Sequence, residues 1–337
     1  MKAGKLPLGV LSSLLDKVEI GDDRVFLGPK VGEDAALIDF GDRFLVAKAD
    51  PITFATDLIG WYLVQINAND IAVMGATPRW LMATLLLPEG TSARSTEAIF
   101  DQVLNACADI GVTLIGGHTE VTFGLPRPIA AGAMLGEVDK DKVVLSSGAM
   151  PGDSIVLTKG IAVEGAAVLA REVEDVLLSA GVGLDTIAAA KKMLFSPGIS
   201  ISREARVACE SATIHAMHDP TEGGVATGLR EMAAAADLGL VVDESRISVL
   251  PECEELCKAL DLNPMGLIAS GALLVAVSPD EAITLVEALD REGIHAREIG
   301  YFTPKGEGLK LQTAAGLREL PSFDRDELAR FLGGLAG

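Results

Sequence analysis

Residues 57–76 show the clearest pattern of hydrophobic and polar positions in the chain. The apolar residues of this segment recur at helical spacing, which predicts a helix with one stripe packed into a core. The stripe consists of Ile59, Leu63, Ile66, Val73 and Met74. Gly75 then supplies a C-terminal stop for the helix.

Three polar residues, Asn67, Asn69 and Asp70, interrupt this apolar helix. Asn67 and Asp70 are three residues apart and therefore share a face of the helix. A carboxylate in such a segment must be paired, bound to a metal ion or placed at a cleft, because burying it alone is costly. A surface position or a cap near the helix end is the alternative for Asp70.

The first half of the chain also predicts several strands. An alternating run at 35–38 and a second strand at 43–49 flank the turn Gly41-Asp42 and form a hairpin, which stops at Asp50-Pro51. The remaining elements are a leading helix and arm at 1–20, strands at 80–87, 113–115 and 127–138, and a helix at 95–110.

A cluster of turn-forming residues at 146–153 separates the two halves of the chain. The length of 337 residues suits two domains, which we place at 1–148 and 149–337. In the second domain, strands alternate with helices. Strands are predicted at 154–158, 213–217, 238–242, 272–278 and 294–299, and helices at 162–172, 184–194 and 200–210.

Composition and charge narrow the possible partners. The formal net charge of −20 argues against a nucleic acid or an anionic membrane, because both require basic patches. A polyanionic ligand such as a nucleotide would need metal ions to offset carboxylate repulsion. No apolar run reaches about 18 residues and no signal-peptide pattern is present, so neither a transmembrane helix nor secretion is predicted.

The 4 cysteines do not form a disulfide framework, and we expect a cytoplasmic protein. Cys107 and Cys209 lie in helical, alanine-rich segments and are expected in the core. Cys253 and Cys257 lie one helical turn apart, where a zinc site is the alternative to ordinary, partly buried thiols. No second Cys or His pair has matching spacing, which favours ordinary thiols.

Two acidic positions lie at the ends of predicted strands. Asp34 follows Gly32-Glu33 at the start of the first strand of the hairpin, and Asp50 follows the second strand. Mg²⁺ takes oxygen ligands and often shares one or two carboxylates with substrate phosphates, and a sheet fixes the position of such carboxylates. The alternatives are an ordinary acidic turn for Asp34 and an Asp favoured before proline for Asp50.

The cluster Gly116-Gly117-His118-Thr119-Glu120 follows a predicted strand and is the most informative candidate. Paired glycines let the backbone approach a ligand closely, and their N–H groups can face phosphate oxygens. His118 and Glu120 add an ionisable pair on one side of an extended run. A tight turn with a satisfied histidine is the alternative. No Gly-Lys-Ser/Thr sequence follows, so the cluster is not a Walker loop.

A second glycine-containing motif, Asp219-Pro220-Thr221-Glu222-Gly223-Gly224, lies at the start of a predicted helix. We predict Thr221 as the N-cap, with Asp219 and Glu222 near the positive end of the helix dipole. Capping alone accounts for these residue types. A role facing a substrate is the second interpretation.

Taken together and in this order, the motifs resemble those of the aminoimidazole ribonucleotide synthetase superfamily, over about residues 5–320. The superfamily also contains thiamine-monophosphate kinase, selenophosphate synthetase and the hydrogenase-maturation dehydratase that makes iron cyanide ligands. The matching segments are 32–36, Asp50, 69–76, 116–119, 151–153 and 219–224. The last of these resembles the hydrogenase-maturation branch most.

The resemblance implies an α/β (α+β) fold of two domains, with an N-terminal sheet that pairs with that of a second subunit and a C-terminal α/β domain. It also implies ATP and Mg²⁺ in a cleft along the N-terminal sheet. The implied metal and phosphate ligands are Asp34, Asp50 and Asp70. The residues bordering the nucleotide would further include Asn67, Asn69, Gly116, Gly117, His118, Thr119 and Glu120, with His118 and Asp50 as catalytic candidates. The substrate would be faced by Asp219, Thr221, Glu222 and Gly223.

Three features depart from the family patterns. The cyanide-making branch carries its substrate on a C-terminal cysteine, whereas residues 331–337 contain none, so no thiocarbamate is expected at that tail. The Gly-Gly-Asp-Thr of that branch and of the kinases reads Gly-Gly-His-Thr here, and a neutral imidazole would weaken metal binding or serve proton transfer. The Cys or selenocysteine loop of the selenophosphate branch is absent.

We therefore expect a homodimeric, ATP- and Mg²⁺-dependent enzyme related to the dehydratase, which activates a substrate oxygen by phosphorylation. The acceptor is a small molecule or a protein-borne group that the motifs do not identify. One alternative is a phosphotransferase of the thiamine-monophosphate kinase kind. The other is a non-catalytic ATP-binding protein that docks on a maturation partner.

Overall fold

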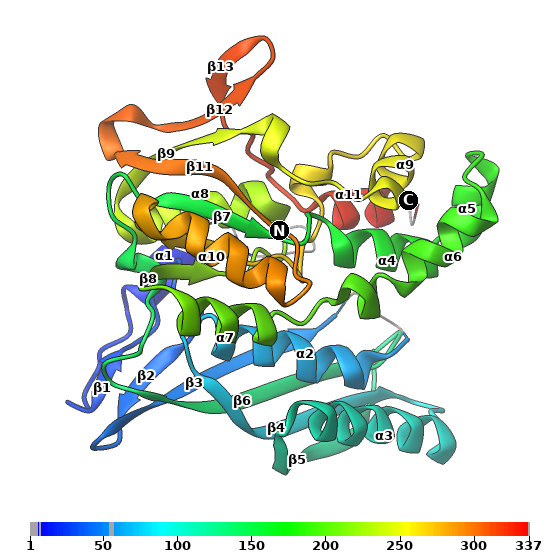
Figure 1. Cartoon of the computed structure of the whole chain (residues 1–337). Coiled ribbons are helices and arrows are strands. Elements are labelled where there is room, and N and C mark those ends of the chain that lie inside the picture. Colours follow the sequence, from blue (N-terminus) through cyan, green and yellow to red (C-terminus); the bar gives the residue numbers. More distant parts are fainter. Residues whose placement is uncertain (1–5, 7, 54–56, 336–337) are drawn as a thin grey trace. The chain divides into compact units, whose positions relative to one another are not determined.

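The computed structural model describes residues 6, 8–53 and 57–335, and the chain forms two compact units (Figure 1). The N-terminal unit comprises Ile20–Gly28 and Asp34–Val143. The C-terminal unit comprises the described residues up to Glu19, Pro29–Glu33, and the chain from Val144 onwards. Residues 1–5 and 7 of the predicted arm, and 336–337 of the tail, lie outside the described residues. The predicted helix in the arm is α1, Leu8–Leu15.

The N-terminal unit is built on a six-stranded sheet with the order β1-β2-β3-β6-β4-β5. Its strands are β1 (Val25–Leu27), β2 (Ala36–Asp39), β3 (Arg43–Ile52), β4 (Thr77–Pro88), β5 (Thr113–Thr122) and β6 (Ile129–Asp139). All neighbouring strands are antiparallel except β4 and β5, which are parallel. The predicted hairpin is confirmed as β2 and β3, but the prediction that it stops at Asp50-Pro51 was wrong, because β3 continues to Ile52 and pairs with β6 along its whole length.

Two helices, α2 (Ile59–Ala72) and α3 (Ala93–Ile110), cover one face of this sheet. Helix α2 contacts β3, β6 and β4, and α3 contacts α2 and β5. The alternation of β3 explains this packing, because Phe44, Val46 and Ile52 are buried beneath the helices, whereas the intervening residues are less buried. The helix predicted within 57–76 is confirmed as α2, but it ends at Ala72, before Val73 and the predicted stop at Gly75, and it is buried along nearly its whole surface rather than on one stripe.

Glycines in β6 allow α2 to approach the sheet closely. A Cβ atom at Gly136 would lie 2.3 Å from Cγ2 of Ile71, and one at Gly132 would lie 2.8 Å from Nδ2 of Asn67. Both distances are shorter than any ordinary contact, so a larger residue would push the helix away from β6.

The C-terminal unit contains a seven-stranded sheet with the order β13-β12-β9-β11-β7-β10-β8. The strands are β7 (Ser154–Thr158), β8 (Ile214–His218), β9 (Leu238–Asp243), β10 (Leu274–Val277), β11 (Ala296–Pro304), β12 (Leu309–Thr313) and β13 (Gly316–Glu319). The helices are α4 (Val163–Glu172), α5 (Glu174–Ser179), α6 (Leu184–Lys192), α7 (Ser202–Ser211), α8 (Gly224–Ala236), α9 (Pro251–Ala259), α10 (Pro279–Arg291) and α11 (Glu327–Leu335). Short helical turns lie at Ser146–Gly148, Leu194–Gly198, Glu244–Arg246, Pro264–Gly266 and Lys305–Glu307.

One large core holds this second sheet against α8. Leu229 and Met232 of α8 are fully buried in the same cluster as Ile155 and Leu157 of β7 and Leu274 of β10. Helix α10 contacts β7, β11 and α7. The fold is thus a two-domain arrangement of mixed helices and sheets, which confirms the expected fold class.

The cysteines follow the prediction except at one position. Cys107, Cys253 and Cys257 are buried, and the Sγ atoms of the last two lie 3.9 Å apart. The expectation that Cys209 is a core residue was wrong, because Cys209 lies on the exposed side of α7. Among the described residues, no helix is both long and apolar enough to cross a membrane.

The two neighbouring glycines of β5 give a matched test of the sheet. A Cβ atom at Gly117, where φ is +147°, would lie 1.8 Å from the carbonyl oxygen of Ala83 in β4, whereas one at Gly116 would meet nothing within 4 Å. We expect Gly117→Ala to lower the free energy of unfolding by about 2 kcal/mol or more, and Gly116→Ala to change it by less than about 1 kcal/mol. Urea denaturation would measure both values, and equal losses in the two variants would contradict this account of β5.

Candidate functional site

In the N-terminal unit, two of the predicted acidic residues meet at one lysine. The Nζ atom of Lys48 lies 3.6 Å from Oδ2 of Asp50 and 3.5 Å from Oδ2 of Asp70. Lys48 and Asp50 point to the same face of β3 because they are two residues apart, and α2 brings Asp70 to that face. We call Lys48, Asp50 and Asp70 the Lys48 cluster.

The three side chains of the Lys48 cluster differ in solvent exposure. The side chain of Asp70 is 5% exposed, that of Lys48 is 23% exposed and that of Asp50 is 36% exposed. One ammonium between two carboxylates leaves a net negative charge, which favours a cationic ligand at this end of β3.

Asn67 fixes the backbone at Asp50. Its Oδ1 atom accepts a hydrogen bond from the backbone N–H of Asp50 at 3.0 Å, and its Nδ2 group donates to the carbonyl of Asp50 at 3.3 Å and to that of Leu63 at 2.9 Å. Strand β2 begins at Ala36, opposite Ala47, so it does not pair with β3 as far along as Asp50. The amide of Asn67 therefore supplies to Asp50 the donor and acceptor that a neighbouring strand would supply.

Asp34 is a buried residue that comes two positions before β2. Since Ala36 pairs with Ala47, Asp34 lies at the same end of the hairpin as Lys48 and Asp50. Among the described residues, the carboxylates of Asp34, Asp50 and Asp70 do not form a group of three within 4.8 Å of one another. Asn69, also predicted at this site, is fully buried in α2.

The cluster at 116–120 lies within the edge strand β5, and all five residues are exposed. Nε2 of His118 lies 3.0 Å from Oε2 of Glu120, so the two side chains do share one side of the strand. The backbone conformation of Gly117 is explained by its pairing with Ala83 of β4, which leaves no room for a side chain. Strands β6 and β4 separate β5 from β3, and three spacings of about 4.8 Å place His118 roughly 14 Å from the strand of Asp50.

In the C-terminal unit, the segment 219–224 connects β8 to α8. Helix α8 begins at Gly224, and its N-cap is Gly223, with φ of +83° and no side-chain cap. The prediction that Thr221 is the N-cap was therefore wrong. Two successive glycines in the left-handed region insert a turn before the helix, in which the carbonyl of Thr221 accepts from the N–H of Gly224 at 3.0 Å.

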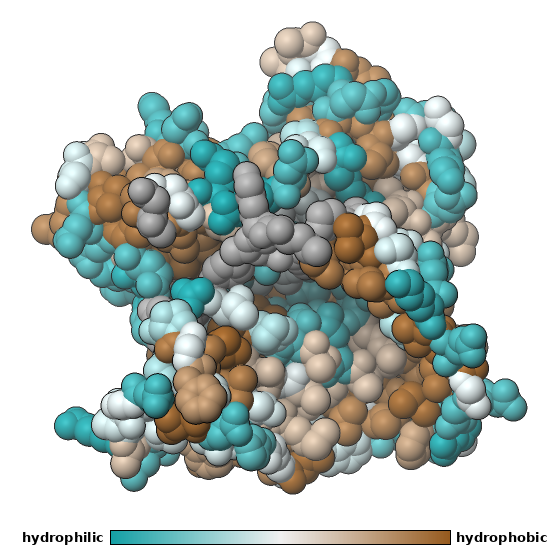
Figure 2. Space-filling model, turned by 180° about the vertical axis from the view of Figure 1, so that it is seen from behind, coloured by the Kyte–Doolittle hydropathy of each residue, from teal (hydrophilic) through white to brown (hydrophobic). Residues whose placement is uncertain are grey.

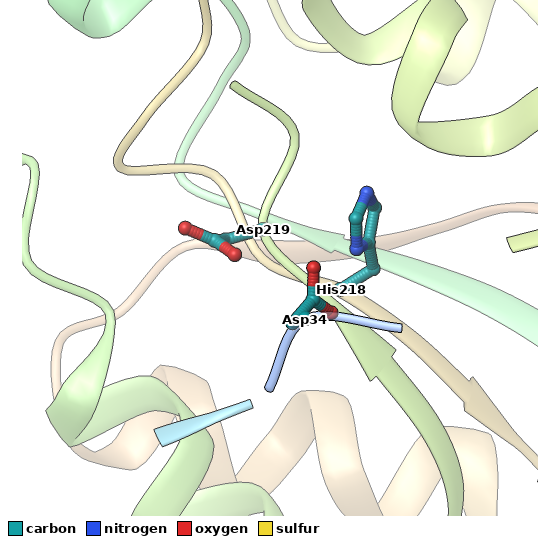
Figure 3. Close-up of side chains that lie close together, drawn as sticks. All are labelled: Asp34, His218 and Asp219. Carbon is teal, nitrogen blue, oxygen red and sulfur yellow. The ribbon is translucent and has the colours of Figure 1, made fainter. Parts of the chain in front are cut away.

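A buried histidine precedes this segment. Nε2 of His218 lies 3.0 Å from Oε2 of Glu231 in α8, and both side chains are almost fully buried. Figure 3 shows His218 beside Asp219, and a ring nitrogen of His218 lies within 4.8 Å of a carboxylate oxygen of Asp219. The figure also draws Asp34, which belongs to the N-terminal unit. Gly228 makes room for this packing, because a Cβ atom there would lie 2.7 Å from Cβ of Pro220.

Two further buried acids lie beside residues 219–224, and the sequence patterns did not single them out. Burial raises the pKa of Glu164 to about 7, with the charges of Asp326 and Glu222 acting in the same direction and hydrogen bonding to Ser270 opposing them. Burial likewise raises the pKa of Asp326 to about 6, while hydrogen bonds from the backbone of Gly223, Leu328 and Ile268 oppose the shift. Glu164, Glu222 and Asp326 thus form a carboxyl group cluster within the C-terminal unit.

Lys48 is the other residue that sequence reasoning missed. The signal was present, because a lysine two positions before Asp50 in a predicted strand must share its face. Asp326 and Glu164 had no such signal, since each comes from an element far along the chain from residues 219–224.

Comparison with known proteins identifies related chains. Residues 32–138 match the family model described as AIR synthase related protein, N-terminal domain, and residues 150–311 match the model of its C-terminal domain. A hydrogenase expression/formation protein of Methanocaldococcus jannaschii is 31% identical over 313 residues, which cover 90% of each chain. The carbamoyl dehydratase HypE of Cupriavidus necator is 27% identical, covering 86% of this chain and 82% of that protein. The selenide, water dikinase of a Geobacter species is 28% identical, covering 90% and 93%.

Solved structures share the fold. The hydrogenase maturation protein HypE in complex with ATP superposes with a TM-score of 0.72 at 22% identity, covering 95% of this chain and 91% of that one. HypE in a complex with HypF gives 0.73 at 22% identity, covering 95% and 100%. ThiL complexed with AMPPCP and TMP gives 0.68 at 18% identity, covering 84% and 88%.

The raised pKa of Glu164 predicts a pH-dependent stability. Its folded pKa of about 7 lies above the ordinary value of 4.5, so the folded state binds the proton more tightly and stability falls as pH rises between these two values. Glu164→Gln should therefore raise the free energy of unfolding at pH 8 by about 2 kcal/mol and flatten this dependence.

Denaturation of the wild type and the variant from pH 5 to pH 8 would measure this effect. Glu254→Gln, at an exposed acid of α9, is the matched control and should leave the pH dependence unchanged. Parallel pH profiles for wild type and Glu164→Gln would show that Glu164 does not titrate in this range.

Proposed function

The chain belongs to the family of AIR synthase related proteins, and from that membership we infer that it is an ATP- and Mg²⁺-dependent enzyme that activates a substrate oxygen by phosphorylation. The relatives named above as hydrogenase expression or maturation proteins and carbamoyl dehydratases favour an amide-like oxygen as the acceptor. The ATP complex of HypE, a protein of the same fold, supports ATP as the nucleotide.

The observation that carries the proposal is the Lys48 cluster. Carboxylate oxygens are the ligands that Mg²⁺ prefers in proteins, and Asp50 and Asp70 present such oxygens around one lysine ammonium, which suits a phosphate group. Asp34, at the same end of the hairpin, would complete the set. The residues present therefore fit Mg²⁺ accompanied by a polyphosphate, and Mg²⁺ would neutralise charge that develops on the phosphates.

The roles of the protein groups follow from this geometry. Asn67 would hold Asp50 in place, and Lys48 would pair with phosphate oxygens of the nucleotide. In the reaction, a bond forms between the γ-phosphorus and the acceptor oxygen, and the bond from that phosphorus to ADP breaks. For an amide acceptor, loss of the phosphorylated oxygen as phosphate and of two N–H protons would leave a nitrile.

The acceptor would be faced by residues of the segment 219–224, namely Asp219, Thr221, Glu222 and Gly223. His118 remains a candidate for proton transfer, together with Glu120.

A homodimer is part of this proposal. The face of the N-terminal sheet that α2 and α3 do not cover carries mostly apolar side chains, which support pairing with a second sheet. These residues are Leu45, Ala47, Ala49, Trp80, Met82, Leu86, Ile129, Ala131, Ala133 and Leu135. Figure 2 shows that hydrophobic side chains reach the surface among hydrophilic ones on the side of the chain that it displays. We also propose a protein partner, which the complex of HypF with HypE, a protein of the same fold, supports. The free thiols of the cysteines favour a cytoplasmic location.

A phosphotransferase is the second candidate. The similarity to a selenide, water dikinase and the shared fold with ThiL favour it. The two candidates share the nucleotide site and differ in where the γ-phosphate goes, whereas a non-catalytic ATP-binding protein would release no ADP.

Nucleotide binding tests the Lys48 cluster. We expect Asp70→Asn and Asp50→Asn each to weaken the binding of Mg·ATP by about tenfold or more, because each removes a charged oxygen ligand. Isothermal titration calorimetry would measure the dissociation constants. Asp42→Asn, at the exposed turn of the same hairpin, is the matched control and should bind as the wild type does. Wild-type affinity in both cluster variants would place the nucleotide elsewhere.

The fate of the γ-phosphate separates the candidates. With labelled ATP and a carbamoylated peptide, the dehydratase reaction should release labelled inorganic phosphate together with ADP and a nitrile that mass spectrometry detects as the loss of one water. Label retained on a small-molecule acceptor would instead favour the phosphotransferase. ATP bound without ADP production across an acceptor panel would contradict both enzyme proposals.

A further inference from the structure

Residues 219–224 are held by backbone contacts from one neighbouring segment of the C-terminal unit. The carbonyl of Thr221 accepts a hydrogen bond from the N–H of Ala269 at 3.3 Å. Gly224 lies against the carbonyl of Met265, since a Cβ atom at Gly224 would come within 2.4 Å of that oxygen. These contacts fix the two ends of the turn but leave the N–H of Gly223, between them, to another partner.

That partner is the carboxylate of Asp326, which comes from a segment far along the chain. Oδ2 of Asp326 accepts from the N–H of Gly223 at 2.6 Å, and Oδ1 accepts from the N–H of Leu328 at 2.7 Å. The second bond satisfies a free N–H group in the first turn of α11, so the same side chain caps α11 and holds the turn. Asp326 is buried, and bonds from N–H groups to a charged acceptor are stronger than bonds between neutral groups.

A charged carboxylate at position 326 is energetically unfavourable. Burial and the charge of Glu222 raise the pKa of Asp326, and burial together with the charges of Asp326 and Glu222 raises that of Glu164. A serine or an asparagine would cap α11 nearly as well without that cost. Only a group with two equivalent acceptor oxygens, however, can bind the N–H of Leu328 and that of Gly223 at once.

We propose that Asp326 is a positioning residue for the substrate, which keeps residues 219–224 in the shape in which Asp219, Thr221 and Glu222 face the acceptor. This role rests on the proposed function, in which those residues meet the substrate. Gly223 and Gly224 have φ values of +83° and +66°, and glycine backbones in this region also populate many other shapes. The hydrogen bond to Asp326 selects one backbone conformation of residues 219–224. Because Asp326 caps α11, this conformation depends on the position of α11 in the C-terminal unit.

Hydrogen–deuterium exchange of the whole chain tests the contact directly. Asp326→Asn keeps the size of the side chain but accepts only one of the two N–H groups, and Asp326→Ser caps α11 but is too short to reach Gly223. In both variants we expect the amides of residues 219–224 to exchange about tenfold faster or more than in the wild type, while β7 and β10 keep their protection.

Glu327→Gln is the matched control at the neighbouring residue. Oε2 of Glu327 accepts from the N–H of Asn263 and pairs with Arg330, so it attaches α11 to the unit without touching residues 219–224. We expect wild-type exchange at 219–224 in this variant. The proposal is overturned if exchange there is unchanged in Asp326→Asn and Asp326→Ser, or if it rises equally in Glu327→Gln.

The pH dependence of amide exchange at residues 219–224 tests whether the charge of Asp326 holds the turn. The bond from the N–H of Gly223 favours the charged form of Asp326, and protonation near its pKa of about 6 removes one of the two acceptor oxygens, so opening of the turn is favoured as pH falls. After correction for intrinsic exchange, the turn should open about fivefold more at pH 5.5 than at pH 7.5. The measurement is made in the Glu164→Gln background, which removes the other titrating acid, and Asp326→Asn should abolish the dependence. A dependence that persists in Asp326→Asn would assign it to another group.

The kinetic consequence separates this proposal from the proposed function. In an active enzyme, Asp326→Asn should lower kcat/KM for the acceptor about tenfold and leave the affinity for Mg·ATP unchanged. A wild type that binds no Mg·ATP would contradict the proposed function, while the exchange experiment would still decide whether Asp326 holds the turn. Unchanged kcat/KM in a variant with fast exchange would refute the positioning role.

Discussion

The N-terminal unit depends on the contact between the amide of Asn67 and the backbone of Asp50. A buried asparagine in an apolar helix must have its polar atoms satisfied, and here the backbone of β3 satisfies them at Asp50, a position that β2 does not reach. The contact needs α2 to lie close to the sheet, which Gly132 and Gly136 of β6 permit. One hydrogen-bonding residue and two glycines thus determine where the carboxylates of Asp50 and Asp70 lie.

The C-terminal unit uses a similar arrangement. A single buried side chain, that of Asp326, binds the backbone N–H of Gly223 and so holds residues 219–224, and it also binds the N–H of Leu328. In both units the held segment carries acidic residues: Asp50 and Asp70 both lie beside Lys48 in one, and the charges of Asp326 and Glu222 help to raise the pKa of Glu164 in the other. Acidic side chains gathered in this way are consistent with ligand sites in an acidic chain.

Much of the fold could be predicted because hydrophobic periodicity is a local signal. The helix at 57–76, the hairpin of β2 and β3 and the strands at 154–158 and 213–217 were all recognisable from the spacing of apolar residues. The order of the motifs was sufficient to indicate the family. Errors arose where the outcome depended on distant atoms: Thr221 is not the N-cap of α8, and Cys209 is exposed. The predicted boundary at 148/149 and the roles of the site residues stay predictions.

The sequence by itself determined the elements, the family and the residue types available for chemistry, because these follow from side chains and their spacing along the chain. The tertiary structure decided which of them meet. Lys48 joins Asp50 and Asp70 only because α2 crosses β3, and two strands lie between β3 and the strand of His118. Asp326 reaches Gly223 across 103 positions of the chain. Contacts of this kind depend on how the elements pack, and no local pattern encodes the packing of segments so far apart.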